Sequence, residues 1–443
     1  MKYRSRCRAE AGRARHERRR ALRPAVIVLA AIGLVGCGAI PPALPVVGPG
    51  QPSFSASGPD AADFGATPAG FPRADVTKFW QTAYLVDSHS RLDEIFPGRL
   101  VARAAVPSPL HRAPVEPVIT YRFEGVERTL DDYLARHPAT GFLVARGDTI
   151  LVERYQYGRR DTDRFTSWSM AKTITAMLVG IALEEGRIRS IDDKPQDYVP
   201  ELAGTEYGRT SIRHLLTMSS GVKFVEEYTT RDDSFRLAAD TFRNVGAGGP
   251  SAVTGYNERL APPGTRFYYA SSETHVLGFV LRAVARRPVA VYLSDAIWRP
   301  MGAEADATWI VDKTGQEATY CCVNAVLRDY ARLALLLAHD GRLGDRQIIP
   351  RAWLLAATTV PTDTPYLKPE VATSFWGYGY QTWIFPGERR MFALLGVRGQ
   401  TIAVDPAAKL VMVHTAVRKR PSGDPAAVEL RALWAGLRER LGK

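Results

Sequence analysis

One stretch constrains the fold of this chain more than any other, the almost unbroken apolar run over residues 173–186 (TITAMLVGIALEEG). A run that is apolar on every side predicts a helix buried at the centre of a domain. Ser169 and Lys172 precede it directly, and their spacing of three places both on one face at the helix N-terminus. The sequence therefore predicts a serine and a lysine held side by side within the core.

This spacing predicts a nucleophile, because a serine hydroxyl reacts poorly at neutral pH unless a neighbouring group accepts or polarises its proton. A dry pocket and the positive end of a helix both lower the pKa of a lysine such as Lys172. A second Ser-x-x-Lys occurs at Ser220 and Lys223. It contains a glycine and follows a short helical pattern, so it predicts a helix end and a turn.

Charge is concentrated at the start of the chain. The net charge is +12 over 443 residues, and residues 1–24 hold ten Lys/Arg and two Glu, which leaves +4 for the rest. That remainder is ordinary for a globular domain and gives no support to nucleic-acid binding.

The basic residues lead into an apolar segment, residues 25–36, that is too short to span a bilayer. A basic region followed by a short apolar one predicts a secretory signal over residues 1–36. The tetrapeptide ending at Cys37 resembles the lipobox of bacterial lipoproteins, which implies lipidation of Cys37 and a location in the cell envelope, facing the periplasm or the exterior. A plain signal peptide or a short membrane anchor is the alternative.

Residues 37–75 are rich in Pro, Gly and Ala, which predicts an unfolded tether, with ordered structure beginning near Val76. The domain at 76–443 begins with strand patterns at 141–147 and 149–156 and has a helical lobe at roughly 187–340. It returns to strands from 378 to 416 and closes with a helix near 425–441. This order predicts an α+β fold in which both chain ends build one antiparallel sheet, flanked by helices, with the helical lobe inserted.

Cys321 and Cys322 would be the cysteines left in the mature domain. Adjacent cysteines rarely bridge, and one pair without a His/Asp cluster gives no metal pattern, so we expect two small buried side chains and no metal.

A serine and lysine pair also needs a proton shuttle and an oxyanion hole. Tyr269 follows a Pro-Pro-Gly turn and precedes a helix, which suits a shuttle, and Ser271 would orient it. The oxyanion hole would use the backbone N–H groups of Ser169 and Gln400, with Gly399 letting substrate lie against the strand.

Together these residues resemble the serine hydrolases with the β-lactamase/penicillin-binding-protein fold. The resemblance covers roughly residue 92 to the C-terminus and is closest to the 6-aminohexanoate-dimer hydrolase and esterase branch. It implies a β-lactamase/transpeptidase-like fold, a covalent acyl-enzyme on Ser169 and no cofactor. The three motifs that carry it are Ser169-x-x-Lys172, Tyr269-Ala270-Ser271 and Arg398-Gly399-Gln400, the last in place of the family's Lys-Thr-Gly.

The resemblance also implies that Arg398 and Tyr228 contact substrate, since Tyr228 corresponds to a tyrosine that closes over substrate in the nylon-oligomer branch. A literal Lys313-Thr314-Gly315 stands more than a hundred residues from the C-terminus, between strand-like and helical segments, and predicts a hairpin turn.

We therefore expect a serine hydrolase that cleaves a small amide or ester. A β-lactamase or D-alanyl-D-alanine carboxypeptidase is one alternative, although the missing lysine of the third motif and the serine ending the second argue against it. A non-catalytic, penicillin-binding-like envelope lipoprotein is the other. The expected partners are a small-molecule substrate and a membrane, reached through a lipid anchor at Cys37, and no nucleic acid.

Overall fold

The computed structural model describes residues 51–228 and 231–442. The predicted signal at 1–36 and the lipidation site Cys37 lie outside the described residues, so both stay predictions. Among the described residues, none of the helices has the length and apolar character needed to cross a bilayer.

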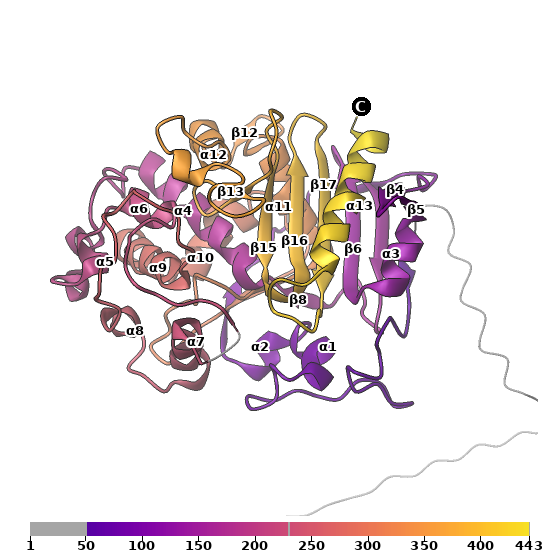
Figure 1. The fold of residues 1–443 in the computed structure, drawn as a ribbon, viewed down its shortest axis with the longest axis horizontal. Helices are drawn as coiled ribbons and strands as arrows, with labels where there is room; N and C mark the ends of the chain where they lie inside the picture. The colour runs from indigo at the N-terminus through magenta and orange to yellow at the C-terminus, as the bar shows by residue number, and fades with distance from the viewer. Residues whose placement is uncertain (1–50, 229–230, 443) are drawn as a thin grey trace, which may run out of the picture. The chain divides into compact units, whose positions relative to one another are not determined.

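A nine-stranded sheet forms the centre of the described chain (Figure 1). Strands from the two chain ends meet where β6 pairs with β17, and all pairs from β7 to β13 are antiparallel, whereas β1 and β3 run parallel to β7. The predicted α+β fold with one mainly antiparallel sheet is therefore confirmed. The strands in spatial order are β1 (Ser53–Phe54), β7 (Thr149–Tyr155), β6 (Ala139–Arg146), β17 (Leu410–Ala416), β16 (Gln400–Asp405), β15 (Phe392–Gly396), β14 (Trp383–Ile384) and β13 (Gly377–Tyr378), with β3 (His111–Arg112) also on β7.

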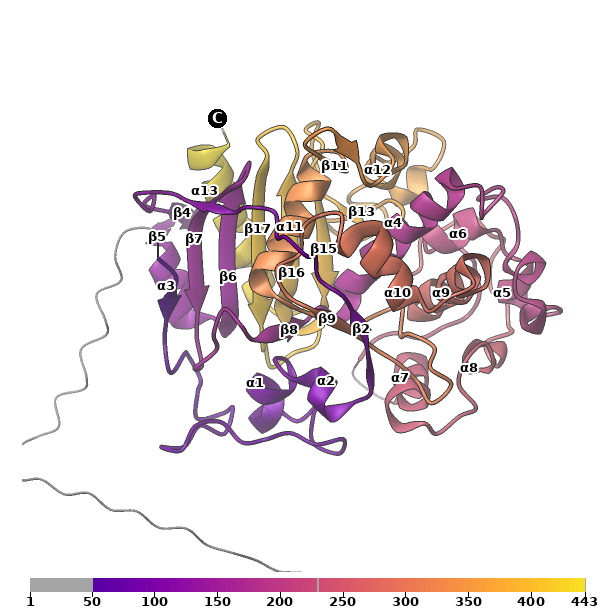
Figure 2. The same ribbon diagram turned by 180° about the vertical axis from the view of Figure 1, so that it is seen from behind.

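Both faces of this sheet are buried, because alternate side chains of each strand point to opposite faces. In β17, Leu410 and Met412 pack with α3 (Leu130–Arg136) and α13 (Ala426–Leu441), whereas Val411 and Val413 face the larger core. That core includes α4 (Ala171–Glu184) and α11 (Leu327–Ala338). Figures 1 and 2 show α13 on one side of the sheet and α11 on the other.

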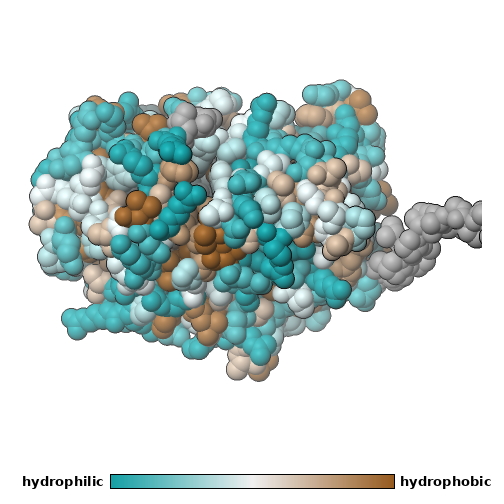
Figure 3. Space-filling model, turned by 90° about the horizontal axis from the view of Figure 1, so that it is seen from below, coloured by the Kyte–Doolittle hydropathy of each residue, from teal (hydrophilic) through white to brown (hydrophobic). Residues whose placement is uncertain are grey.

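The helical lobe stands beside the nine-stranded sheet, and the described chain also forms a smaller four-stranded sheet. The face that carries α1 (Leu85–Ser88), α2 (Leu92–Ile95) and α7 (Asp233–Arg243) is mostly hydrophilic, with apolar residues gathered near its middle (Figure 3). The lobe helices are α5 (Glu206–Arg209), α6 (Ile212–Leu216), α7 (Asp233–Arg243), α8 (Ser251–Thr254), α9 (Ser271–Ala285) and α10 (Val289–Leu293), extended by a π-helical turn, Ser294–Trp298. The smaller sheet has the order β2 (Gly98–Val101), β9 (Ala307–Ile310), β10 (Val323–Val326) and β8 (Arg164–Thr166).

The remaining elements are α1 (Leu85–Ser88), α2 (Leu92–Ile95), α12 (Arg351–Ala357), β4 (Thr120–Phe123), β5 (Val126–Thr129), β11 (Arg342–Leu343), β12 (Arg346–Gln347) and 3₁₀ turns at Thr82–Tyr84, Trp168–Met170, Pro195–Asp197, Pro200–Leu202, Pro365–Leu367 and Val397–Gly399.

The predicted central helix is α4, in which every residue from Ala171 to Ala182 is buried. A 3₁₀ turn, Trp168–Met170, precedes it and carries Ser169. The prediction of a buried central helix that begins beside the serine is therefore confirmed.

The structure corrects the predicted extent of the tether, because ordered packing is present well before Val76. Ser53–Phe54 pairs with β7, and the ring of Phe64 is fully buried edge-on against Tyr157. Composition misled the prediction, since three aromatic residues, Phe54, Phe64 and Phe71, pack against Tyr155 and Tyr157 from a segment otherwise rich in Pro and Gly.

A second correction concerns the adjacent cysteines. Cys321 and Cys322 form a disulfide bond with each other, whereas the sequence favoured two free thiols. Both are buried, as expected, at 3% and 0% exposure.

Candidate active site

Ser169 lies in the turn between β8 and α4, beside the end of β15. The residue before it, Trp168, has φ +43°, a backbone conformation that is uncommon outside glycine and is concentrated at functional sites. The Trp168 ring is held edge-on against Trp80, with 5.0 Å between ring centroids. The turn that presents the serine is thus fixed by aromatic packing.

Lys172 is one turn further along, and its Nζ donates to Ser169 Oγ over 2.9 Å and to the carbonyl of Tyr320 over 2.8 Å. The rings of Tyr269 and Tyr320 flank it, at 5.0 and 5.8 Å from Nζ to the centroids. Burial lowers the pKa of Lys172 to about 8, against a smaller opposing effect of the charge on Glu226. A lysine with this pKa can exist partly as the neutral amine near physiological pH, as a base for serine requires.

Tyr269 is the third residue at this point, and it lines the same cavity as Ser169. Its ring stacks on Trp383, with 5.5 Å between centroids and 22° between planes. Burial, and then the charge of Glu226, raise the pKa of Tyr269 well above its usual value. The phenol therefore stays protonated and can donate a proton to a leaving group.

Glu226 is a residue of the site that the sequence reasoning missed. Its carboxylate accepts the backbone N–H of Ser271 over 2.6 Å and the Ser271 hydroxyl over 2.7 Å, and it also accepts the Tyr228 hydroxyl. It sits at the N-terminus of α9, where a negative charge is favoured. Ser271 therefore binds this carboxylate rather than Lys172. The acidic loop at 226–227 hinted at a role, but nothing in the sequence indicates which of its two carboxylates turns inward.

The third motif lies beside the serine turn. β15 ends at Gly396, where an added Cβ would lie 2.5 Å from the carbonyl oxygen of Ser167. Gly399, at φ +98°, and Gln400 line the same cavity as Ser169. The Gln400 side chain is held to Ala416 by hydrogen bonds of 2.7 and 3.1 Å, so its amide does not point into the cavity. Gly399 and Gln400 thus border the cavity at Ser169, and the role of the Gln400 N–H in an oxyanion hole stays a prediction.

Arg398 does not contact either cavity at Ser169, which corrects its predicted place at the substrate. Its guanidinium is buried, donates to the carbonyls of Arg418 and Lys419 over 2.9 and 2.7 Å, and lies 4.3 Å from the centroid of the Trp80 ring. Burial lowers its pKa to about 10. Arg398 thus fixes the backbone of the third motif.

The two competing motifs lie outside the site. Lys313-Thr314-Gly315 forms a turn closed by Asp312, and the Gly315 carbonyl accepts from Arg99 and Arg282. Ser220 donates to buried Glu273 over 2.5 Å, and exposed Lys223 pairs with Glu258.

Two cavities meet at Ser169 and Tyr228, one of about 310 Å³ and one of about 160 Å³. Aromatic side chains line both, which suits a substrate with an apolar part on each side of the reacting carbonyl. Tyr228 has φ +61° and lines both cavities, and its contact with substrate stays a prediction. Among the described residues there is no cluster of three His, Cys, Asp or Glu suited to a metal ion. The larger cavity includes Tyr269, Trp376, Trp383, Phe385 and Gln400, and the smaller includes Phe79, Trp80, Phe235, Phe242 and Cys321.

Known proteins resemble this chain in sequence and in fold. The model of the beta-lactamase family matches residues 126–435. The 6-aminohexanoate-dimer hydrolase of Paenarthrobacter ureafaciens is 27% identical over 363 residues, covering 80% of this chain and 92% of that protein. A Bacillus anthracis structure provisionally described as a 6-aminohexanoate-dimer hydrolase superposes with a TM-score of 0.72 at 25% identity, covering 83% of this chain and 97% of that one. A family VIII carboxylesterase shares the fold, with a TM-score of 0.52, 20% identity and coverage of 68% and 93%.

Proposed function

This chain belongs to the beta-lactamase family, and from that premise we propose that it hydrolyses a small linear amide or ester through an acyl-enzyme on Ser169. The observation that carries the proposal is the contact between Lys172 Nζ and Ser169 Oγ, in a buried pocket with the Tyr269 phenol beside them. A nucleophile, a base with a lowered pKa and a protonated acid are thus in one place.

The chemistry follows from these roles. Neutral Lys172 takes the proton of Ser169 as the hydroxyl attacks the carbonyl carbon, and the backbone N–H groups of Ser169 and Gln400 stabilise the oxyanion. Tyr269 gives its proton to the departing amine or alkoxide and is reprotonated from Lys172. Water then attacks the acyl-enzyme by the same groups in reverse and releases the acid.

The substrate class is inferred from the cavities and from the third motif. Aromatic walls on both sides of Ser169 suit an extended molecule with apolar segments. The Arg398 guanidinium is occupied by backbone carbonyls, and Val397, the other position at which the family's cation could align, is apolar. The third motif itself therefore offers no free positive charge to a β-lactam carboxylate, although Arg418, Arg420 and Arg431 line the larger cavity. This favours a linear amide or ester, of the kind named for the 6-aminohexanoate-dimer hydrolase, over a β-lactam or a D-alanyl peptide.

We also propose that the enzyme is held in the cell envelope by a lipid on Cys37 and faces the periplasm or the exterior. The support is the sequence of residues 1–37. Loss of membrane association in Cys37→Ser, with the enzyme then found in the soluble fraction, is the expected result.

The function is tested by intact-mass spectrometry after treatment with a fluorophosphonate and, separately, with a penicillin, followed by peptide mapping. We expect one fluorophosphonate on Ser169, no long-lived penicillin adduct, and turnover on a panel of esters and short amides. Ser169→Ala should lose both labelling and turnover while keeping its fold.

Other outcomes lead elsewhere. A long-lived penicillin adduct on Ser169 would move the function to the peptidoglycan side, and rapid penicillin hydrolysis would make it a β-lactamase. Stoichiometric labelling with no turnover of any substrate would indicate the non-catalytic binding protein.

A further inference from the structure

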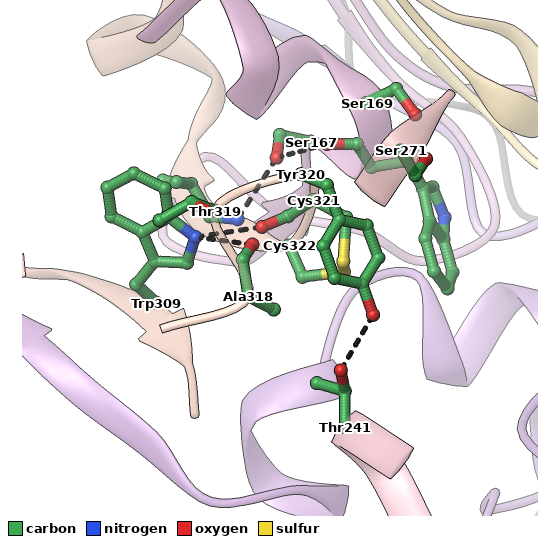
Figure 4. The surroundings of a disulfide bond; sticks show 12 residues. Ser167, Ser169, Thr241, Ser271, Trp309, Ala318, Thr319, Tyr320, Cys321 and Cys322 are labelled. Carbon is green, nitrogen blue, oxygen red and sulfur yellow. Dashed lines mark hydrogen bonds between the residues drawn. A yellow bond between two sulfur atoms is a disulfide. The ribbon is translucent and has the colours of Figure 1, made fainter. Parts of the chain in front are cut away.

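The segment that contains the disulfide contacts the catalytic lysine. The carbonyl of Tyr320, immediately before Cys321, accepts the Lys172 ammonium over 2.8 Å. The Tyr320 hydroxyl in turn donates to Thr241 in α7 over 2.8 Å (Figure 4). Besides Ser169, this carbonyl is thus a second hydrogen-bonding partner of Lys172 Nζ, and its position sets where the amine lies.

The same segment contacts the turn that presents the nucleophile. The backbone N–H of Cys322 donates to the Trp168 carbonyl over 3.3 Å. The backbone N–H of Ser167 donates to the carbonyl of Val323 over 2.7 Å, and the Val323 N–H returns a hydrogen bond of 3.0 Å to the Ser167 hydroxyl. The residues on either side of Cys321 and Cys322 therefore support the lysine at one end and the serine turn at the other.

The backbone between these two supports has an unfavourable conformation. Cys322 has φ +72°, in the left-handed region that costs a non-glycine residue roughly 1 kcal/mol or more. The bond between the two sulfur atoms closes a small ring around this residue and limits the conformations open to it. The indole Nε1–H of Trp309 also donates a hydrogen bond of 2.8 Å to the Cys321 carbonyl, which further fixes this backbone (Figure 4).

We propose that the Cys321–Cys322 disulfide is a positioning element for the Ser169–Lys172 pair, so that hydrolysis reaches its full rate only when the two cysteines are bridged. The inference rests on the proposed function, since it concerns the same nucleophile and base. Neither cysteine touches the substrate's reacting atoms in this scheme, because both act through the backbone of the neighbouring residues.

Although both cysteines are buried, Cys321 lines the smaller cavity, which gives a small dithiol reductant a route to its sulfur. One thiolate of the reductant attacks the Cys321 sulfur, breaks the bond between the cysteines and forms a mixed disulfide, while the Cys322 thiolate takes a proton. The second thiolate of the reductant then attacks its own sulfur in the mixed disulfide and releases Cys321 as a thiol. The dithiol is oxidised to a cyclic disulfide, and the two cysteines gain two electrons and two protons.

Reduction frees Cys322 to leave its left-handed conformation, which moves the Tyr320 carbonyl away from Lys172. Misplacing a catalytic group by a fraction of an ångström to an ångström lowers rates by on the order of 10- to 100-fold. The ammonium form of Lys172 also loses an acceptor, which lowers the pKa of the lysine. Glu226 and Tyr269, the titratable groups that face the amine from other segments, keep their effect on it, whereas the Tyr320 ring belongs to the segment that moves.

The experiment compares the full-length protein before and after dithiothreitol, with peptide mapping to show that Cys321 and Cys322 are reduced. We expect kcat for an ester substrate to fall on the order of tenfold or more, with a smaller change in KM, and to return after reoxidation. The matched control is the double variant Cys321→Ser/Cys322→Ser, which keeps Cys7 and Cys37. It should have the kcat of the reduced enzyme and no response to dithiothreitol.

A second measurement does not depend on turnover. Lysines labelled with carbon-13 at Cε are titrated by NMR in both redox states, and the Lys172 signal is assigned by its loss in Lys172→Arg. We expect the pKa of Lys172 to be lower in the reduced protein. Unchanged kcat in fully reduced enzyme, or a change confined to KM, overturns the inference. If the oxidised enzyme neither turns over nor reacts with fluorophosphonate, the proposed function fails, and an unchanged Lys172 titration would then overturn the positioning role by itself.

Discussion

Lys172 Nζ donates a hydrogen bond to Ser169 Oγ over 2.9 Å, and Lys172 is only 1% exposed. Such burial makes the ammonium form costly, and this is why the pKa of Lys172 is lowered to about 8. The same contact that gives serine a base therefore also sets the pH dependence of the enzyme and part of its stability.

The acid limb of the pH profile should report this lysine. Because only the neutral amine accepts the serine proton, kcat/KM for an ester is expected to rise with pH and to level off above about 8. Steady-state rates between pH 5 and 10 measure it. A rate that instead falls between pH 7 and 9 would mean that the ammonium form is the active one.

Replacing the catalytic lysine should stabilise the folded protein. The pKa of Lys172 drops from 10.5 to about 8 on folding, so the penalty is fully present below pH 8 and the unfolding free energy rises with pH between about 8 and 10.5. The lowered pKa corresponds to a loss of about 3 kcal/mol of unfolding free energy, which the variant recovers. The variant also loses the hydrogen bond to Tyr320, which offsets about 1 kcal/mol of this gain. Lys172→Met should therefore gain roughly 2 kcal/mol at pH 7 in urea unfolding, with turnover lost. A variant less stable than the parent would show that the ammonium is better solvated than its burial suggests.

Tyr269→Phe should affect poor leaving groups most. The phenol remains protonated, because burial and Glu226 raise its pKa, so it serves as the acid for the departing group. We expect a loss on the order of 100-fold for amides and alkyl esters and a much smaller loss for a nitrophenyl ester, whose leaving group needs no proton. Tyr268→Phe is the matched control, since Tyr268 is the adjacent, 38% exposed tyrosine. Equal losses for both leaving groups would contradict the acid role.

Sequence patterns predicted the fold because the signals were local. An apolar run gave α4, and strand patterns gave the hairpin β6–β7 and the C-terminal strands, which the structure joins in one sheet. The motif residues Ser169, Lys172 and Tyr269 also meet in space. Their spacing and the resemblance to a known family were sufficient to bring them together.

The predictions that failed, and the residue that was overlooked, concern contacts between segments far apart along the chain or backbone conformations that the sequence does not indicate. Bridging of Cys321 to Cys322 depends on the backbone at Cys322, whose positive φ has no sequence signal in a cysteine. Arg398 was expected at the substrate, yet the carbonyls of Arg418 and Lys419 and the ring of Trp80 hold it elsewhere. These partners lie 20, 21 and 318 residues from Arg398 along the chain, so no local sequence pattern indicates them. Glu226 could not be separated from its neighbour by charge or spacing.

Gly396 should be required for the approach of β15 to the serine turn. Its backbone has φ −132°, which any residue adopts, but a Cβ would lie 2.5 Å from the Ser167 carbonyl oxygen. Gly396→Ala should therefore push the strand away, cost about 1 to 3 kcal/mol of stability and lower kcat. Gly255→Ala is the control, because its φ is −73° and an added Cβ meets no atom within 4 Å. Chemical unfolding and ester kinetics measure both variants, and equal behaviour of the two would refute the steric argument.

Glu226→Gln should change the pH profile and substrate affinity together. The carboxylate raises the pKa of Lys172 by its charge, so the amide should lower that pKa below about 8 and move the acid limb of kcat/KM to lower pH. The substitution also weakens the hydrogen bond that the Tyr228 hydroxyl donates to residue 226. This loss of about 1 kcal/mol should raise KM roughly fivefold. Glu227→Gln, which changes the exposed adjacent carboxylate in the same way, should leave both quantities as in the parent. If the two variants share one pH profile, Glu226 exerts no charge effect on the lysine, and the inward turn of its carboxylate serves only to hold α9 and Tyr228 in place.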